Sequence, residues 1–292
     1  MIRVQPAKII GGFFIYMKKT ILSVIFLFII FTGAQASPKY ISLAPSTTEI
    51  LFALGLDEEI VGVSSFCNYP PQTITKVNVG DFSHPNMEKI ISLKPDYIFC
   101  TGLEQAPAIE ELRSLGFNVY VADPKTVEEL LRTIVDIAAI TRRGKEANAL
   151  IWDMKTEIDK IKEKVKPIPK HLRVKVFIEI WYEPLMTAGG GSFVDELITL
   201  AGGVNIAHNI PRPYSYFSAE NVIRFNPGCI IMAYMDKENP LELIEGRSGW
   251  DTIKAVKNKQ VFNDINPDTL LRPGPRIIEG LKELYKRLYP EK

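Results

Sequence analysis

The residue types that most often carry out catalysis or hold metals are few in this chain and form no recognisable set. Three histidines occur, His84, His171 and His208, without the HxxxH or HxH spacing that brings two imidazoles to one metal ion. The run Gly189 to Ser192 is similar to an anion-binding turn at a helix start, but it lacks the lysine of a phosphate-binding loop. We therefore expect a binding protein with no resident cofactor or metal. A secreted enzyme, such as a metal chelatase or a hydrolase that uses this turn, is the alternative.

Aromatic side chains are concentrated in loops next to the predicted strands. Ligands of open α/β sheets bind at the carboxyl ends of the strands, so rings in these loops can line one site from both halves of the chain. Such rings suit a large, flat, partly apolar ligand. The loop residues that we expect to contact this ligand are Phe66, Tyr69, Phe82, His84, Trp181, Tyr182, Tyr214 and Tyr216.

Two pairs of charged residues are further candidates. Asp268 and Arg272 stand just before Pro273-Gly274-Pro275 in a predicted loop, where they offer one acceptor and one bidentate donor to a polar ligand edge. A surface salt bridge between them is the alternative. Glu88 and Glu220 occupy the first turns of two helices, where the helix dipole alone favours acidic residues. Because the same charge occurs in both halves, the two glutamates also offer a two-point docking surface for a pseudo-symmetric partner.

The elements that must position these residues alternate between short apolar strands and amphipathic helices, a pattern typical of an α/β fold with mainly parallel strands. A capping box of Ser46 and Glu49 predicts the start of the first helix. Apolar residues at steps of three and four predict one continuous helix over 144–166. The predicted strands cover 40–43, 60–64, 97–100, 118–121, 174–180, 229–232 and 261–262, and the other helices cover 87–93, 104–115, 192–200, 219–225, 250–256 and 275–288.

A segment of the first half is repeated in the second half. Residues 86–95 align with residues 218–227 at a constant offset of 132, and each segment leads from a helix cap into an apolar strand. Shared cap chemistry explains part of this similarity, but its length favours two related lobes. We predict an N-terminal lobe over 37–141, an interlobe helix over 142–166 and a C-terminal lobe over 167–292.

Four segments together carry a resemblance to a known family: residues 41–49, 61–71, 86–96 and 275–278. The chain resembles the helical-backbone (class III) periplasmic substrate-binding proteins of ABC importers, which carry cobalamin, haem or ferric siderophores. Within that family it is most similar to the cobalamin-binding branch. The resemblance implies two Rossmann-like lobes with mainly parallel sheets, one long interlobe helix and a ligand held between the lobes.

The resemblance also assigns roles to residues. It implies that Glu88 and Glu220 dock on an ABC permease dimer, and that the protein is a monomer. For a haem or ferric-siderophore carrier, which is the alternative to a cobalamin-like corrinoid, His84 or Tyr69 would approach the iron. Thr101 joins the ligand-binding positions because Phe82, Thr101 and Tyr214 stand where characterised cobalamin binders carry tryptophan. The positions that match the ligand site of the family are Phe66, Phe82, Tyr214, Asp268 and Arg272.

The first 36 residues have the composition of a secretory signal peptide. They contain four basic and no acidic residues, an apolar run over 21–31, and the motif Ala34-Gln35-Ala36. We expect translation to start at Met17, cleavage near Ala36 and a periplasmic product, with an uncleaved anchor as the alternative. The remaining 256 residues carry a formal net charge of −3, which argues against bulk nucleic-acid binding.

Three cysteines, Cys67, Cys100 and Cys229, make an odd number for an oxidising compartment. No CxxC spacing occurs, so we expect no structural zinc site. The sequence leaves two states open: a disulfide between Cys67 and Cys100, or three buried free thiols.

Overall fold

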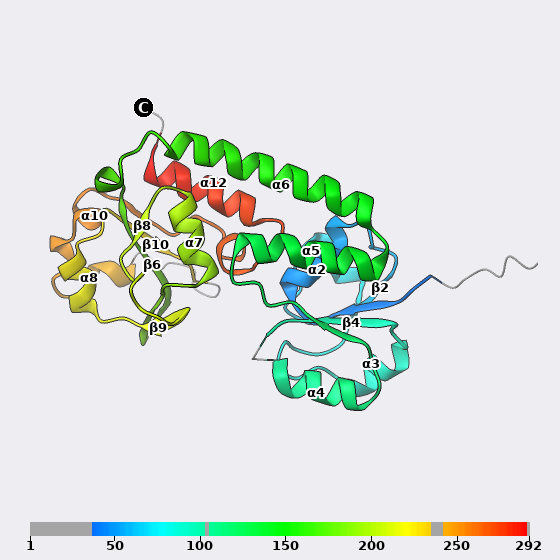
Figure 1. Ribbon diagram of the computed structural model, residues 1–292. Coiled ribbons are helices and arrows are strands. Elements are labelled where there is room, and N and C mark those ends of the chain that lie inside the picture. The colour runs from blue at the N-terminus through cyan, green and yellow to red at the C-terminus, as the bar shows by residue number, and fades with distance from the viewer. Residues whose placement is uncertain (1–36, 103–104, 235–241, 291–292) are drawn as a thin grey trace, which may run out of the picture. The chain divides into compact units, whose positions relative to one another are not determined.

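The computed structural model describes residues 37–102, 105–234 and 242–290, and its element labels are those of Figure 1. Residues 1–36, for which we predict a signal peptide, lie outside the described residues. Within the described part, no helix is both long and apolar enough to cross a bilayer. Lys39 to Lys292 form one unit by their internal contacts.

The first half is built on a five-stranded sheet with the order β3-β2-β1-β4-β5, in which every pair is parallel. Its central strands are apolar on both faces because helices cover them, as parallel sheets require. The carboxyl ends of these strands therefore meet at one edge. The strands are β1 Tyr40–Ser42, β2 Ile60–Val63, β3 Val77–Asn78, β4 Tyr97–Cys100 and β5 Val119–Val121, and the helices are α2 Pro45–Ala53, α3 Met87–Leu93, α4 Ala106–Ser114 and α5 Val127–Thr141.

The second half contains a six-stranded mixed sheet with the order β11-β10-β6-β7-β9 and with β8 paired to β6. The strand β7 runs antiparallel to both β6 and β9, a hairpin that the sequence did not predict. The strands are β6 Lys175–Tyr182, β7 Leu185–Ala188, β8 Val204–Asn205, β9 Tyr214–Tyr216, β10 Cys229–Met232 and β11 Val261–Phe262, and the helices are α7 Phe193–Leu200, α8 Ala219–Phe225, α9 Glu242–Glu245, α10 Lys254–Lys257, α11 Asp268–Leu271 and α12 Ile277–Leu288.

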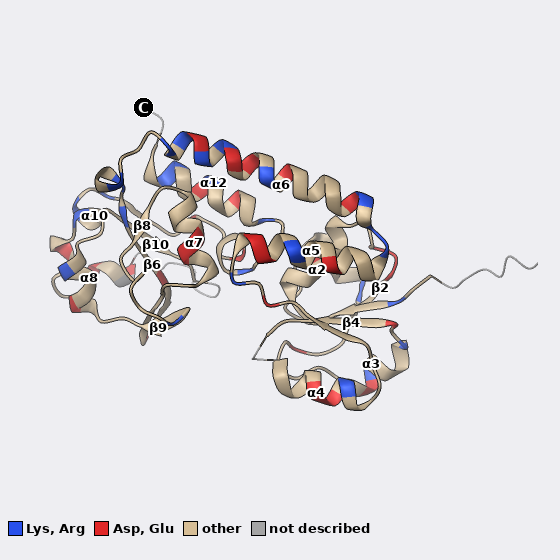
Figure 2. Ribbon diagram, in the orientation of Figure 1, with Lys and Arg blue, Asp and Glu red and all other residues tan. Residues whose placement is uncertain are grey.

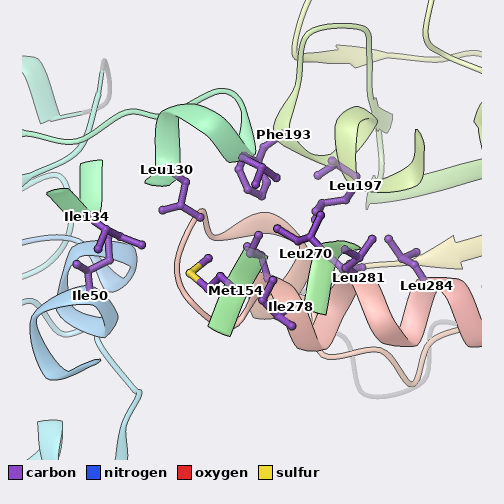
Figure 3. Close-up of a cluster of buried hydrophobic side chains, with 14 of the residues drawn as sticks. Ile50, Leu130, Ile134, Met154, Phe193, Leu197, Leu270, Ile278, Leu281 and Leu284 are labelled. Carbon is purple, nitrogen blue, oxygen red and sulfur yellow. The ribbon is translucent and has the colours of Figure 1, made fainter. Parts of the chain in front are cut away.

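A long helix, α6 Gly144–Val165, contacts α5 from the first half and α7 and α12 from the second half (Figure 1). Its buried residues include Met154, Ile158 and Ile161 at helical spacing, which confirms the predicted apolar stripe. Figure 2 shows acidic and basic residues at the start of α6 and mixed along its second half. The largest apolar cluster is continuous from α2 and α5 through α6 to α7 and α12 (Figure 3).

The repeated segments fold alike. The helices α3 and α8 have seven residues each, with bounds that differ by 132, and so do the bounds of β4 and β10. Asn86 Oδ1 accepts a hydrogen bond from the Lys89 N–H at 2.9 Å, and Ser218 Oγ accepts one from the Asn221 N–H at 3.2 Å. The predicted caps are confirmed.

Several local predictions were wrong. The helix α2 begins at Pro45 with Ala44 as its N-cap, and no side chain caps it, so the Ser46–Glu49 capping box does not form. Proline presets the backbone of a first helical turn, so the helix begins one residue before the predicted start, and the Glu49 carboxylate binds Arg276 instead of a backbone N–H. Asp268 starts the short helix α11 rather than lying in a loop. The helix predicted over 250–256 is a 3-10 turn, Trp250–Thr252, followed by α10.

All three cysteines are buried free thiols, so the alternative of a Cys67–Cys100 disulfide is wrong. Burial raises the pKa of Cys100 and of Cys229 to about 12. These thiols pack as small apolar side chains.

Candidate ligand-binding site

Two of the predicted rings in the first half lie against each other. Phe66 follows β2, Phe82 follows β3, and their ring centroids are 6.3 Å apart in an edge-to-face arrangement. The Ser65 N–H donates to the Gly80 carbonyl at 2.8 Å, which ties the two loops together. Phe66 nevertheless keeps 53% of its surface exposed, so the pair presents an open aromatic face.

In the second half, three side chains form a row across the sheet. Trp181 of β6 pairs with Met186 of β7, which in turn pairs with Tyr216 of β9. Register partners share one face of a sheet, so the three side chains are neighbours. Tyr214 lies two residues before Tyr216 and therefore on the same face. Tyr182 contacts Trp181 with a centroid distance of 5.7 Å and is partly buried.

These rings account for most of the exposed aromatic surface. Six aromatic side chains are exposed among the residues that the structure describes, and five of them are in the predicted ligand-binding set. The sixth is Trp152 on α6, which is 68% exposed. The five are Phe66, Tyr69, Trp181, Tyr214 and Tyr216.

Asp268 and Arg272 contact each other and are mostly buried. The Arg272 guanidinium lies 2.9 Å from Asp268 Oδ2 and donates to Asn68 Oδ1 at 2.7 Å. Both charged side chains are about 13–14% exposed. The two residues form the salt bridge that the sequence left as an alternative. Asn68 joins this salt bridge from the first half of the chain.

A second ion pair between the halves was missed by the sequence analysis. Arg276 donates to Glu49 through Nε at 2.9 Å and through a terminal nitrogen at 2.6 Å, and the Glu49 side chain is 3% exposed. Burial raises the pKa of Glu49, and the facing guanidinium opposes that rise. The same guanidinium lies 3.9 Å from the centroid of the Tyr69 ring.

The Tyr69 ring thus lies against Arg276 and not against the Phe66–Phe82 pair. Tyr69 lines a cavity of about 610 Å³ with Glu49, Arg276 and residues of α2, α6 and α12, and none of the other predicted ligand-binding residues lines it. Glu49 and Arg276 both lie in segments that carried the family resemblance, which was the one signal for them in the sequence. Because Glu49 was interpreted as part of a helix cap, its pairing with Arg276 was not predicted.

The remaining candidates have simple surroundings. His84 is exposed beside Asp81, and Thr101 donates its hydroxyl hydrogen to the Ala122 carbonyl at 2.7 Å, so that hydrogen is already used. Glu88 and Glu220 are both exposed in the first turns of α3 and α8. Within the described ranges, no group of three or more His, Cys, Asp or Glu side chains lies close enough to hold a metal ion.

The Gly189 to Ser192 turn serves the fold. The Gly189 N–H donates to the Pro213 carbonyl and the Gly190 N–H donates to the Ile210 carbonyl. A Cβ on Gly190 would lie 2.1 Å from the His208 carbonyl oxygen, so glycine is needed for this close approach. Ser192 is buried, donates its hydroxyl hydrogen to Gly189 O at 2.7 Å and caps α7, so the N–H groups of Gly189 and Gly190 and the Ser192 hydroxyl are already used.

Two α/β halves that share one long helix and present aromatic side chains from the carboxyl ends of their strands define a two-lobed solute-binding protein. Residues 41–266 match the periplasmic binding protein family. A Bacillus subtilis relative, the uncharacterized ABC transporter substrate-binding lipoprotein YvrC, is 35% identical over 258 residues, which cover 87% of this chain and 80% of the relative.

Solved structures agree. The structure of a possible iron-binding (periplasmic solute-binding) protein from Staphylococcus epidermidis is 33% identical with a TM-score of 0.74, covering 86% of this chain and 98% of that one. The vitamin B12 binding protein BtuF of Vibrio cholerae is 29% identical with a TM-score of 0.72, covering 86% and 96%. The chain therefore belongs to the periplasmic binding protein family and is a substrate-binding protein of the ABC transporter type.

Proposed function

We propose that this protein captures a cobalamin-like corrinoid between its two halves and delivers it to an ABC permease. The observation that carries the proposal is the concentration of exposed aromatic surface in the predicted ligand-binding loops, where five of the six exposed rings of the described residues lie. An exposed aromatic ring keeps its apolar surface in contact with water, and a ligand that covers the ring buries this surface. A broad macrocycle has the flat apolar face that such rings can stack against.

The nature of the rings supports a flat ligand rather than a small polar one. Phe66 and Phe82 offer an apolar face in the first half, and the row of Trp181, Met186 and Tyr216 offers another in the second half. The relative from Vibrio cholerae is a vitamin B12 binding protein. The exported product would act outside the cytoplasmic membrane, as expected for this family.

A ferric siderophore or haem is the second candidate ligand. The Staphylococcus epidermidis relative described as possibly iron-binding supports it, at 33% identity. His84 has an exposed imidazole, a group that iron accepts as a ligand, and it contacts Asp81 at 3.4 Å.

Calorimetric titration of the mature protein with cyanocobalamin, hemin and ferrichrome distinguishes these ligands. We expect cyanocobalamin to bind with a Kd in the micromolar range or tighter, and Trp181→Ala to weaken that binding about tenfold or more because a stacked ring is lost. Trp152→Ala is the matched control, since it removes an exposed ring outside the predicted loops. Binding of hemin or ferrichrome without cyanocobalamin would replace the corrinoid proposal, and equal losses for both variants would contradict the site.

A further inference from the structure

One buried amide connects the loops that follow three strands of the first sheet. Gln105 is fully buried at the start of α4. Its Nε2 donates to the Leu43 carbonyl at 2.9 Å and to the Phe82 carbonyl at 2.8 Å, and its Oε1 accepts from the Thr101 N–H at 2.8 Å. These partners follow β1, β3 and β4 at the sheet edge where the aromatic rings lie.

A primary amide is the side chain that these partners require. Two carbonyls need two donors on one nitrogen, and one N–H needs an acceptor, a combination that glutamine and asparagine supply. A carboxylate would repel both carbonyl oxygens, because it has no hydrogen to donate to them. An apolar side chain would leave three buried backbone groups without hydrogen-bond partners. The length of glutamine lets one amide span all three loops.

We infer that Gln105 is a positioning residue that holds Phe82 for ligand binding. The amide fixes the backbone of Phe82, and the Phe82 ring in turn contacts Phe66 at 6.3 Å. Gln105 does not itself belong to the exposed aromatic surface, so it acts through Phe82. This inference rests on the proposed ligand site, but it does not depend on which chelate binds there.

A double-mutant cycle tests the inference. The Kd of cyanocobalamin, or of whichever of hemin and ferrichrome the wild type binds, is measured for Gln105→Met, Phe82→Ala and the double variant. We expect Gln105→Met to weaken binding about tenfold in the wild-type background and to have almost no further effect when Phe82 is absent. An equal loss in both backgrounds, or no loss in either, would overturn the positioning role.

Two further measurements separate positioning from general destabilisation. Leu112→Ala opens a cavity under the same helix α4 and keeps the hydrogen bonds of Gln105 to Leu43, Phe82 and Thr101, so it should lower stability and leave the Kd unchanged. Hydrogen exchange of residues 79–86 should accelerate in Gln105→Met and not in Leu112→Ala. This arm needs no ligand, so unchanged exchange overturns the inference even if no probe binds the wild type. If the Met variant does not fold, Gln105→Asn, which is too short to reach all three loops, takes its place.

Discussion

At the scale of single residues, the charges that join the two halves are buried in pairs. Glu49 and Arg276 are 227 positions apart in sequence and form a two-point ion pair with side chains 3% and 10% exposed. Neither charge could remain in this place alone, because removing one partner leaves a buried charge without compensation. The pair therefore ties α2 to the segment that begins α12.

The loss of Arg276 should be costly and pH-dependent. We expect Arg276→Gln to lower the free energy of unfolding by roughly 3–5 kcal/mol near neutral pH. Burial already raises the pKa of Glu49, and without Arg276 it rises further. A raised folded-state pKa means that Glu49 is protonated in the folded variant as the pH falls, so the deficit should shrink toward pH 4 and grow again toward pH 7.

Urea unfolding at several pH values measures this effect. Arg132→Gln is the control, since Arg132 pairs with Glu128 on the surface of α5 with both side chains at least 70% exposed. That variant should change stability by less than about 1 kcal/mol at every pH. A pH-independent deficit in Arg276→Gln would contradict the role of the buried carboxylate.

At the scale of elements, α3 and α8 form a repeated unit with one exposed glutamate each. Both helices have a side-chain cap, seven residues and a left-handed residue at the C-cap, Lys94 or Asn226. Their identical construction presents Glu88 and Glu220 in equivalent positions of the two halves. Hydrogen bonds from its own N–H and from Ser218 lower the pKa of Glu220, which keeps it charged.

We expect the double reversal Glu88→Lys with Glu220→Lys to abolish uptake while leaving ligand affinity within about twofold of the wild type. We propose that the two glutamates contact basic residues of the permease, so the reversal would set like charges against each other. Uptake by cells and calorimetric affinity, measured in parallel, test this. The control is reversal of Glu110 and Glu111 on α4, two exposed acidic residues outside the repeated helices. Normal uptake by the double variant would remove the docking role.

At the scale of the whole molecule, the apolar core does not stop at the boundary between the halves. The largest cluster includes Ile50 of α2, Met154 of α6 and Phe193 of α7, and Figure 3 shows these side chains with others from α5 and α12. The Val127 N–H at the start of α5 also donates to Glu196 of α7 at 2.7 Å. Because one core serves both sheets, we expect a single cooperative unfolding transition.

Phe193→Ala tests this continuity. The variant should lose about 3–5 kcal/mol of stability, and hydrogen-exchange protection of β4 and of β10 should fall together at the same urea concentration. Val135→Ala, which removes an exposed apolar side chain from α5, should have little effect. Separate midpoints for the two strands would show that the halves unfold independently.

The sequence by itself determined the local features, because these depend on residues within about one helical turn. Asn86 and Ser218 cap their helices because each side-chain oxygen accepts a hydrogen bond from the N–H three residues later. The apolar stripe of α6 follows helical periodicity. The α/β class, the repeat at an offset of 132 and the loop positions of the aromatic residues could also be predicted, because each follows from a pattern of residue types along the chain. The two cap-based repeats α3 and α8 were predicted to the residue.

Only the tertiary structure decided what each polar side chain faces. Glu49 has the spacing of a cap yet pairs with Arg276, and Arg272 contacts Asn68 at a separation of 204 positions. The β6–β7 hairpin and the three loops joined by Gln105 likewise depend on neighbours far apart in the chain. Such contacts follow from how whole layers pack, and no short-range pattern encodes the partner that a buried charge or amide must find.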